Sequence, residues 1–140
     1  MRPGKREEVE GWMKKHNIKV MVLEETYVKQ NTREVRKGFT WYFSGENKTG
    51  RKWTAGVAII VETTYVKYIE DIEPINDRIM HITIRGTMPI TLICVYIPQA
   101  ARTTEEKEEV YDELEKYTRK NEQRTNIHFR RHECKNTASK

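Results

Sequence analysis

Short apolar runs separated by polar turns dominate the pattern along this chain. Each run has the length of a β-strand, and most are rich in the β-branched and aromatic side chains that favour strands. The predicted strands are residues 18–23, 39–43, 55–61, 65–69, 79–85 and 90–97. Because short turns, such as the one at residues 86–89, connect consecutive runs, the pattern indicates a largely antiparallel meander.

A helical period precedes the first of these runs. Val9, Trp12, Met13 and His16 recur at the spacing of one helix face, which predicts an amphipathic helix over residues 5–16. The next run, residues 18–23, is apolar on both strand faces, so we expect it to be covered on both sides. Residues 29–38 are polar and predict a connection without regular structure.

A second helix is predicted over residues 104–120. Val110, Leu114 and Tyr117 lie along one face, and Thr103 and Glu106 have the spacing of a capping box, in which side chains bind the first free amides of the helix. Residues 123–140 show no period and many basic side chains, so we expect an irregular or disordered tail.

The fold class that follows is α/β with α+β character. We expect a partial four-layer α/β/β/α sandwich in which two helices cover one mixed, mostly antiparallel sheet. The expected organisation is one domain over residues 1–122 and a basic tail over residues 123–140.

Amino-acid composition adds little to the predicted fold and function. Hydrophobic residues make up 36% and charged residues 34% of the 140 positions, which predicts a modest core and a highly charged surface. The formal net charge of +5 agrees with a polyanionic partner and equally with a solvated surface. No run is long enough to span a bilayer and no signal peptide is visible, so we expect an intracellular protein of the nucleus or cytoplasm without a membrane partner.

Two cysteines do not make a disulfide framework, and we expect no disulfide-linked partner. Cys94 lies inside an apolar run and is most simply a small core residue. In the tail, His128, His132 and Cys134 have the spacing H-x3-H-x-C, but a zinc site requires four ligands at a recognised spacing and no second cysteine pair is present.

Glu25 and Tyr96 are the main candidates for chemistry. Glu25 follows an apolar run directly, and a carboxylate at the end of a strand can bind a hard cation such as Mg²⁺. Tyr96 ends another run seventy residues later, and we expect the two side chains to lie near each other at a sheet edge. The alternatives remain open: Glu25 is the polar start of a loop, and Tyr96 is a rim aromatic with its hydroxyl in water.

Three basic residues are candidates for binding nucleic acid. Arg51 and Lys52 precede Trp53 in a glycine-containing loop that could contact a phosphate backbone, although a solvated hairpin tip explains them equally well. Arg78 follows Asn76 and Asp77, where turn chemistry is the simpler interpretation.

At this point the motifs resemble those of a known family. Residues 22–26 (Val-Leu-Glu-Glu-Thr) resemble the Leu-Gln-Glu-Thr metal-binding motif of the endonuclease/exonuclease/phosphatase superfamily. Residues 56–60 look like its Gly-Val-Ala central strand, and residues 94–100 resemble its Tyr-x-Pro motif. More narrowly, the chain is similar to apurinic-endonuclease-like domains of LINE-type, non-LTR retrotransposons and to craniofacial development protein 2-like sequences, over about residues 5–122.

The resemblance implies a Mg²⁺-dependent DNA endonuclease in which Glu25 binds the metal and Tyr96 contacts the scissile phosphate. The chain departs from the family pattern in four ways. Glu24 replaces a glutamine, and the first strand that carries an asparagine of the metal site is absent before Lys5. Neither a Gly-Asp-x-Asn nor an Asp-His motif is present. We therefore expect an incomplete domain of retrotransposon origin, truncated at both ends, whose tail arose by a frameshift or premature stop.

Three functions remain open from the sequence. The first is an endonuclease domain that is inactive as this chain. A second is a non-catalytic, decayed or domesticated remnant that binds nucleic acid weakly. The third is a phosphatase of the same superfamily.

Overall fold

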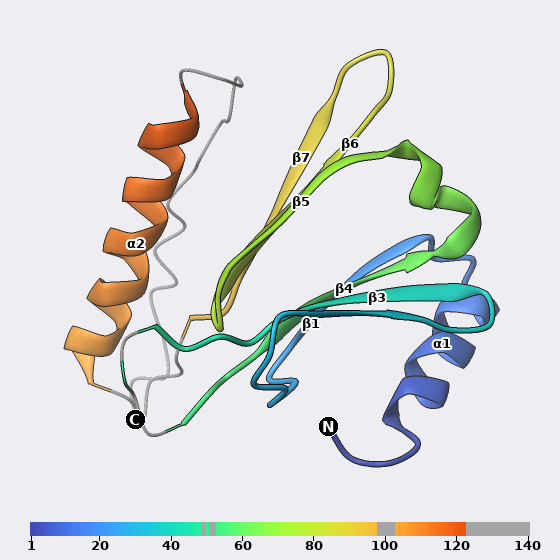
Figure 1. The fold of residues 1–140 in the computed structure, drawn as a ribbon, viewed down its shortest axis with the longest axis horizontal. Helices are drawn as coiled ribbons and strands as arrows, with labels where there is room; N and C mark the ends of the chain where they lie inside the picture. Colours follow the sequence, from blue (N-terminus) through green and yellow to red (C-terminus); the bar gives the residue numbers. More distant parts are fainter. Residues whose placement is uncertain (49, 51–52, 98–102, 123–140) are drawn as a thin grey trace, which may run out of the picture. The chain divides into compact units, whose positions relative to one another are not determined.

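The computed structural model describes residues 1–48, 50, 53–97 and 103–122, which belong to two compact units. Residues 1–96 form the first unit and residues 97–140 the second. The first unit has two stacked antiparallel sheets, and a helix covers the outer face of one of them (Figure 1).

The first sheet, sheet A, has four strands in the order β1-β4-β3-β2. The strands are β1 (Val20–Glu24), β2 (Thr32–Val35), β3 (Phe39–Ser44) and β4 (Val57–Glu62). Strand β4 is central because β1 and β3 both pair with it, with Leu23 opposite Ala58 in one ladder and Phe43 opposite Ala58 in the other. Both faces of β4 are buried, which explains its continuous apolar sequence.

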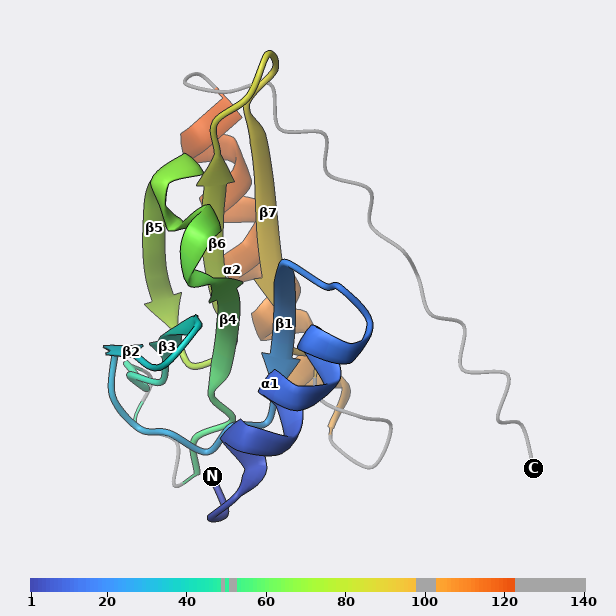
Figure 2. The same ribbon diagram turned by 90° about the vertical axis from the view of Figure 1, so that its right-hand side faces the viewer.

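The second sheet, sheet B, is a three-stranded meander of β5 (Ile69–Asn76), β6 (Ile79–Ile84) and β7 (Ile90–Val95). A 3₁₀-helix, η1 (Thr63–Tyr68), carries the chain from β4 in sheet A to β5 in sheet B. Figure 2 shows β1 and β7 as the edge strands on the same side of the two sheets, while β2 and β5 form the opposite edges.

The main core lies between the two sheets. Val57, Ile59 and Val61 of β4 face Met80 and Ile82 of β6, and all five are fully buried. On the other face of sheet A, α1 (Lys5–Lys15) buries Val9 and Met13 against a second cluster that contains Phe39, Trp41 and Phe43. Glu10 of α1 anchors the helix, since its Oε1 accepts hydrogen bonds from Trp41 Nε1 at 2.8 Å and Arg36 Nε at 2.7 Å.

The second unit contains α2 (Thr104–Glu122). The predicted capping residue is confirmed, because Thr103 Oγ1 accepts a hydrogen bond from the backbone N–H of Glu106 at 3.3 Å. Val110, Leu114 and Tyr117, the predicted apolar stripe, are the residues of this helix with little exposed surface, together with Thr118. The predicted tail over residues 123–140 lies outside the described residues.

The mixed helix and strand class is confirmed, and several details of the prediction are wrong. Two antiparallel sheets replace the single mixed sheet, because η1 breaks the meander and redirects it. Residues 65–69, predicted as a strand, lie mostly within η1. The polar connection 29–38 contains β2, an edge strand that tolerates polar side chains because only β3 pairs with it.

Two burial predictions in the first forty residues also fail. Strand β1 is not covered on both faces: it is an edge strand, and Val22 keeps 43% of its surface exposed. In α1, Trp12 is half-exposed and contacts His16 in a tilted arrangement, with ring centroids 4.5 Å apart, instead of joining the core.

Candidate metal and phosphate site

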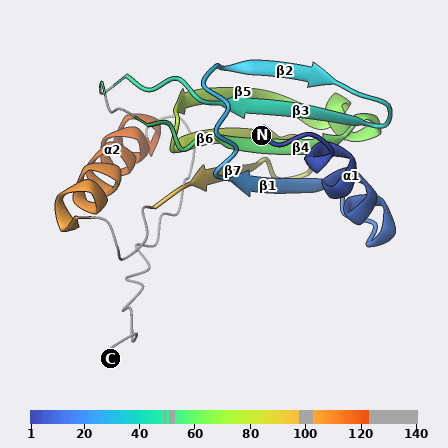
Figure 3. The same ribbon diagram turned by 90° about the horizontal axis from the view of Figure 1, so that it is seen from below.

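A hydrogen bond joins the two main candidate residues across the two sheets. Tyr96 Oη donates to Glu25 Oε1 over 2.8 Å. Glu25 follows β1 directly and Tyr96 follows β7 directly, and the two strands run in the same direction in Figure 3. The predicted proximity of Glu25 and Tyr96 is therefore confirmed, although they are 71 positions apart in the chain.

The backbone at Glu25 has an unusual conformation. Glu25 has φ +54° and Tyr27 has φ +57°, both in the left-handed region that side chains other than glycine rarely adopt. Backbone hydrogen bonds hold the segment between them: Thr26 N–H donates to Gly56 O at 3.1 Å and Tyr27 N–H donates to Ala55 O at 2.9 Å. The strained turn directs the exposed Glu25 side chain toward Tyr96.

Gly56 permits this close approach. It has φ +75°, and a Cβ added there would lie 2.4 Å from Thr26 Oγ1 and 3.0 Å from Tyr27 N. A larger residue would therefore push the Glu25 turn away from β4. The Gly-Val-Ala sequence at residues 56–58 thus has a physical reason in this structure, namely contact between backbone segments.

Asp77 fixes the other side of Gly56. The fully buried Asp77 accepts the Ala55 N–H through Oδ2 at 3.0 Å, and its carbonyl oxygen accepts the Gly56 N–H at 2.9 Å. Asn76 shapes the same β5–β6 turn, since its Oδ1 accepts the N–H groups of Arg78 and Ile79 at 2.8 and 3.0 Å. The turn chemistry expected for Asn76 is therefore confirmed.

The same turn also supports Tyr96. Tyr96 N–H donates to Arg78 O at 2.7 Å, which continues the ladder between β6 and β7 by one more residue. The Tyr96 side chain is almost entirely buried in the core between the sheets, so its ring is held rigidly while the hydroxyl reaches Glu25. Glu25, Gly56, Asp77 and Tyr96 are therefore connected by one set of short hydrogen bonds.

Burial and charge shift two titratable groups near the end of β1. Burial raises the pKa of the Glu24 carboxyl above its usual value, and the negative charge of Glu25 raises it further. Burial likewise raises the pKa of the Cys94 thiol to about 12, with a smaller contribution from Glu24. Cys94 is therefore a protonated core residue.

Glu25 offers the kind of ligand that a hard divalent cation prefers. It is exposed and presents carboxylate oxygens at the end of a strand, and Mg²⁺ is commonly held by one or two carboxylates with several waters.

Of the three basic residues predicted to bind nucleic acid, only Arg78 is among the described residues. Arg78 lies beside Tyr96 in the sheet, is fully buried, and has its guanidinium carbon 5.2 Å from the centre of the Trp53 ring. Its contact with nucleic acid stays a prediction. Arg51 and Lys52 lie outside the described residues, as do His128, His132 and Cys134.

Sequence reasoning missed Asp77 as a structural element of this site. In sequence, an Asn-Asp turn with a buried acid looks the same as an Asn-Asp turn in solvent. The hydrogen bond from Ala55 N–H to Asp77 shows that this acid is part of the structure around Gly56. Gly56 carried a usable signal, because a glycine at the start of a buried strand often marks a close approach of two backbones.

Comparison with known proteins adds no relative. No protein-family model matches the chain, and no curated protein or solved structure is significantly similar to it. Among the described residues, no helix is long and apolar enough to cross a membrane.

Proposed function

We propose that this chain carries part of a Mg²⁺-dependent phosphodiesterase site that acts on DNA. The observation that carries the proposal is the 2.8 Å hydrogen bond between Tyr96 Oη and Glu25 Oε1 at the ends of two strands. The strained backbone at Glu25 adds support, because backbone strain concentrates at functional sites. The motif resemblance around Glu25, Gly56 and Tyr96 supplies the reaction class and the substrate.

The two side chains would have complementary roles. Glu25 would hold Mg²⁺, which stabilises the negative charge that develops on a phosphate during displacement. Tyr96 donates its single hydroxyl proton to Glu25 in this structure, and it would exchange that hydrogen bond for one to a non-bridging phosphate oxygen, a form of electrostatic stabilisation. Both groups bind and orient the phosphate, and neither activates water.

The chain itself is proposed to bind DNA without cleaving it. The sequence contains neither Gly-Asp-x-Asn nor Asp-His, the motifs that supply the groups for water activation in the family it resembles. Because catalytic groups act as a unit, removal of one member abolishes most of the rate enhancement. Weak, Mg²⁺-assisted and salt-dependent DNA binding is what remains.

The test combines binding and cleavage on the full chain. We expect Mg²⁺ to increase binding to abasic and supercoiled DNA, no nicking above background, and loss of the Mg²⁺ effect in Glu25→Ala. Glu70→Ala, which removes an exposed acid from β5, should keep the effect. A Mg²⁺ effect that survives Glu25→Ala, or no Mg²⁺ effect at all, contradicts the proposed site. Nicking that Glu25→Ala abolishes would make the chain an active nuclease, and hydrolysis of phosphomonoesters would favour a phosphatase.

A further inference from the structure

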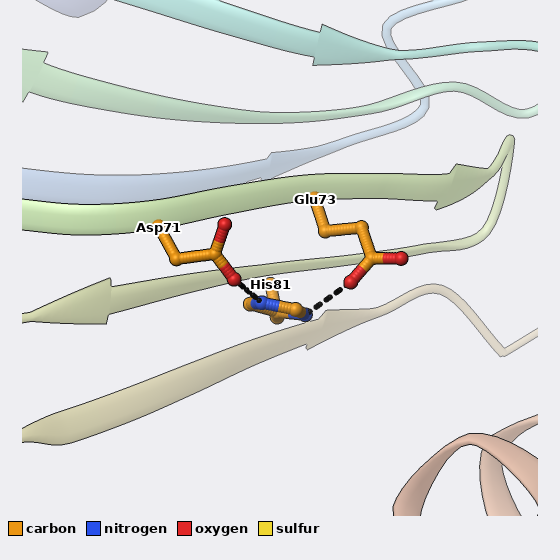
Figure 4. A group of neighbouring side chains, drawn as sticks. All are labelled: Asp71, Glu73 and His81. Carbon is orange, nitrogen blue, oxygen red and sulfur yellow. Dashed lines mark hydrogen bonds and ion pairs between the residues drawn. The ribbon is translucent and has the colours of Figure 1, made fainter. Parts of the chain in front are cut away.

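Sheet B carries a second group of possible metal ligands, away from Glu25. Asp71 and Glu73 of β5 meet His81 of β6, and one ligand atom from each lies within 4.8 Å of the others (Figure 4). His81 pairs directly with Glu73 in the ladder, and its neighbours Met80 and Ile82 point into the core, so His81 lies on the opposite face of the sheet.

The two carboxylates approach different nitrogen atoms of the imidazole. His81 Nε2 lies 2.9 Å from Asp71 Oδ2, and Nδ1 lies 3.9 Å from Glu73 Oε2. Figure 4 shows the ring held between the two acids. His81 keeps only 4% of its surface exposed, whereas the Asp71 and Glu73 side chains remain 60% and 56% exposed. The ring is therefore fixed in place, and an ion can approach along the carboxylates from solvent.

We propose that Asp71, Glu73 and His81 form a site for a divalent transition metal such as Zn²⁺, separate from the Glu25 site. His81 Nε2 and the Asp71 carboxylate are the two protein ligands, and water fills the other two positions of a four-coordinate site. With bonds of about 2.0–2.2 Å to zinc, a tetrahedral site separates two ligand atoms by about 3.3 Å, so the 2.9 Å pair needs to open by only a few tenths of an ångström.

Glu73 acts as a positioning residue in this site. A histidine that binds a metal through one nitrogen commonly donates the N–H of the other to a carboxylate, which fixes the ring and its tautomer. Glu73 Oε2 lies 3.9 Å from Nδ1, which is too long for a hydrogen bond, so the exposed Glu73 side chain has to move closer to take this role. Zinc binds the lone pair of Nε2 and leaves the ring proton on Nδ1, and zinc binding weakens as the pH falls because protons compete for the ligand atoms.

The His81 site and the Glu25 site should prefer different metals, because the His81 site has an imidazole nitrogen as a ligand. Nitrogen ligands favour Zn²⁺ over Mg²⁺, while carboxylates and water suit Mg²⁺. Zinc is therefore the diagnostic probe for the His81 site, and the proposal stands independently of any nuclease function.

The experiment is zinc titration of the full chain, with the tail ligands removed by His128→Gln, His132→Gln and Cys134→Ser in every sample. A chromophoric chelator measures affinity by competition, and NMR of the imidazole nitrogens identifies the coordinated atom. We expect coordination through Nε2, loss of the site in His81→Gln, and zinc affinity at least about tenfold lower in Asp71→Asn and in Glu73→Gln. Glu70→Gln, which removes an exposed acid outside both sites, should bind zinc as the parent does.

If His81→Gln fails to fold, Asp71→Asn is the variant that tests the proposal. It should fold, because the Asp71 side chain is largely exposed. Circular dichroism verifies that each variant is folded. Zinc affinity that is unchanged in Asp71→Asn, coordination through Nδ1, or no zinc binding by the parent overturns the proposal. The last result would leave His81 as an ion-paired side chain without a metal.

Discussion

At the residue scale, the conformation of Glu25 connects the sequence to the proposed function. A left-handed backbone costs roughly 1–2 kcal/mol for a residue with a side chain, and Glu25 and Tyr27 both adopt it within three positions. The hydrogen bonds to Ala55 and Gly56 hold this turn in place. A glutamate in this strained position is easier to explain by a need to place its carboxylate than by stability.

Gly56 provides the sharpest residue-scale prediction. Gly56→Ala should lower the free energy of unfolding by about 1–3 kcal/mol, since the new Cβ meets Thr26 Oγ1 at 2.4 Å in a left-handed backbone. Urea denaturation measures the change. The matched control is Gly11→Ala in α1, where nothing lies within 4 Å of the added Cβ and the helix gains about 0.5–1 kcal/mol. Equal stability of Gly56→Ala and the parent would show that the close contact is not maintained in solution.

Glu24 gives a prediction with a defined pH dependence. The pKa of the Glu24 carboxyl is raised in the folded chain, so the folded state binds this proton more tightly than the unfolded state does. The free energy of unfolding therefore falls as the pH rises from the usual pKa of a glutamate through the raised pKa of Glu24. Glu24→Gln removes this penalty. It should stabilise the chain by about 0.5 kcal/mol at neutral pH, a modest value because Glu24 is partly exposed, and by nothing below about pH 4.

Urea denaturation at the two pH values measures this difference. Glu70→Gln, an exposed acid on β5, is the control for loss of a surface charge. A gain for Glu24→Gln that is the same at both pH values would contradict the assigned cause.

At the scale of elements, the Glu10 carboxylate is one of the groups that attach α1 to sheet A. Glu10 Oε1 accepts from the fully buried Trp41 and from Arg36. Glu10→Ala should lower the free energy of unfolding by about 1–3 kcal/mol, because a buried indole N–H loses its acceptor. Glu10→Gln keeps an acceptor oxygen and should lose less.

Glu8→Ala is the matched control, since Glu8 is 59% exposed and pairs with an exposed Arg2. It should change stability by no more than about 0.5 kcal/mol. If Glu8→Ala destabilises the chain as much as Glu10→Ala, the indole hydrogen bond does not explain the docking of α1.

Elements were predictable from the sequence where local pattern and packing agree. The helix at α1, strands β3, β4, β6 and β7, and the Thr103 cap of α2 follow from apolar period and capping chemistry. Strand β2 was missed because it is held by ladder bonds to β3 and by an ion pair between Arg6 and Glu34, not by apolar side chains. The β-branched and aromatic composition of η1 favours a strand, but this segment instead links the two sheets as a 3₁₀-helix.

At the scale of the whole molecule, the site depends on contacts that no local pattern contains. Strand β1 pairs with β4, not with the strand that follows it, and the division into two sheets brings the end of β1 to the end of β7. Sequence motifs predicted that Glu25 and Tyr96 lie together. The hydrogen bond of Asp77 and the partner of Gly56 arise from chain segments that are distant in sequence, so the fold was needed to identify them, although Gly56 itself signalled a close approach of two backbones.

A Mg²⁺ titration of the isotope-labelled full chain, followed through backbone amide shifts in NMR spectra, tests whether Glu25 binds Mg²⁺. We expect saturable shifts centred on residues 24–27 and on Tyr96, their loss in Glu25→Gln, and their retention in Glu70→Gln. Shifts that are absent, that centre elsewhere, or that persist unchanged in Glu25→Gln would contradict a Mg²⁺ site at Glu25.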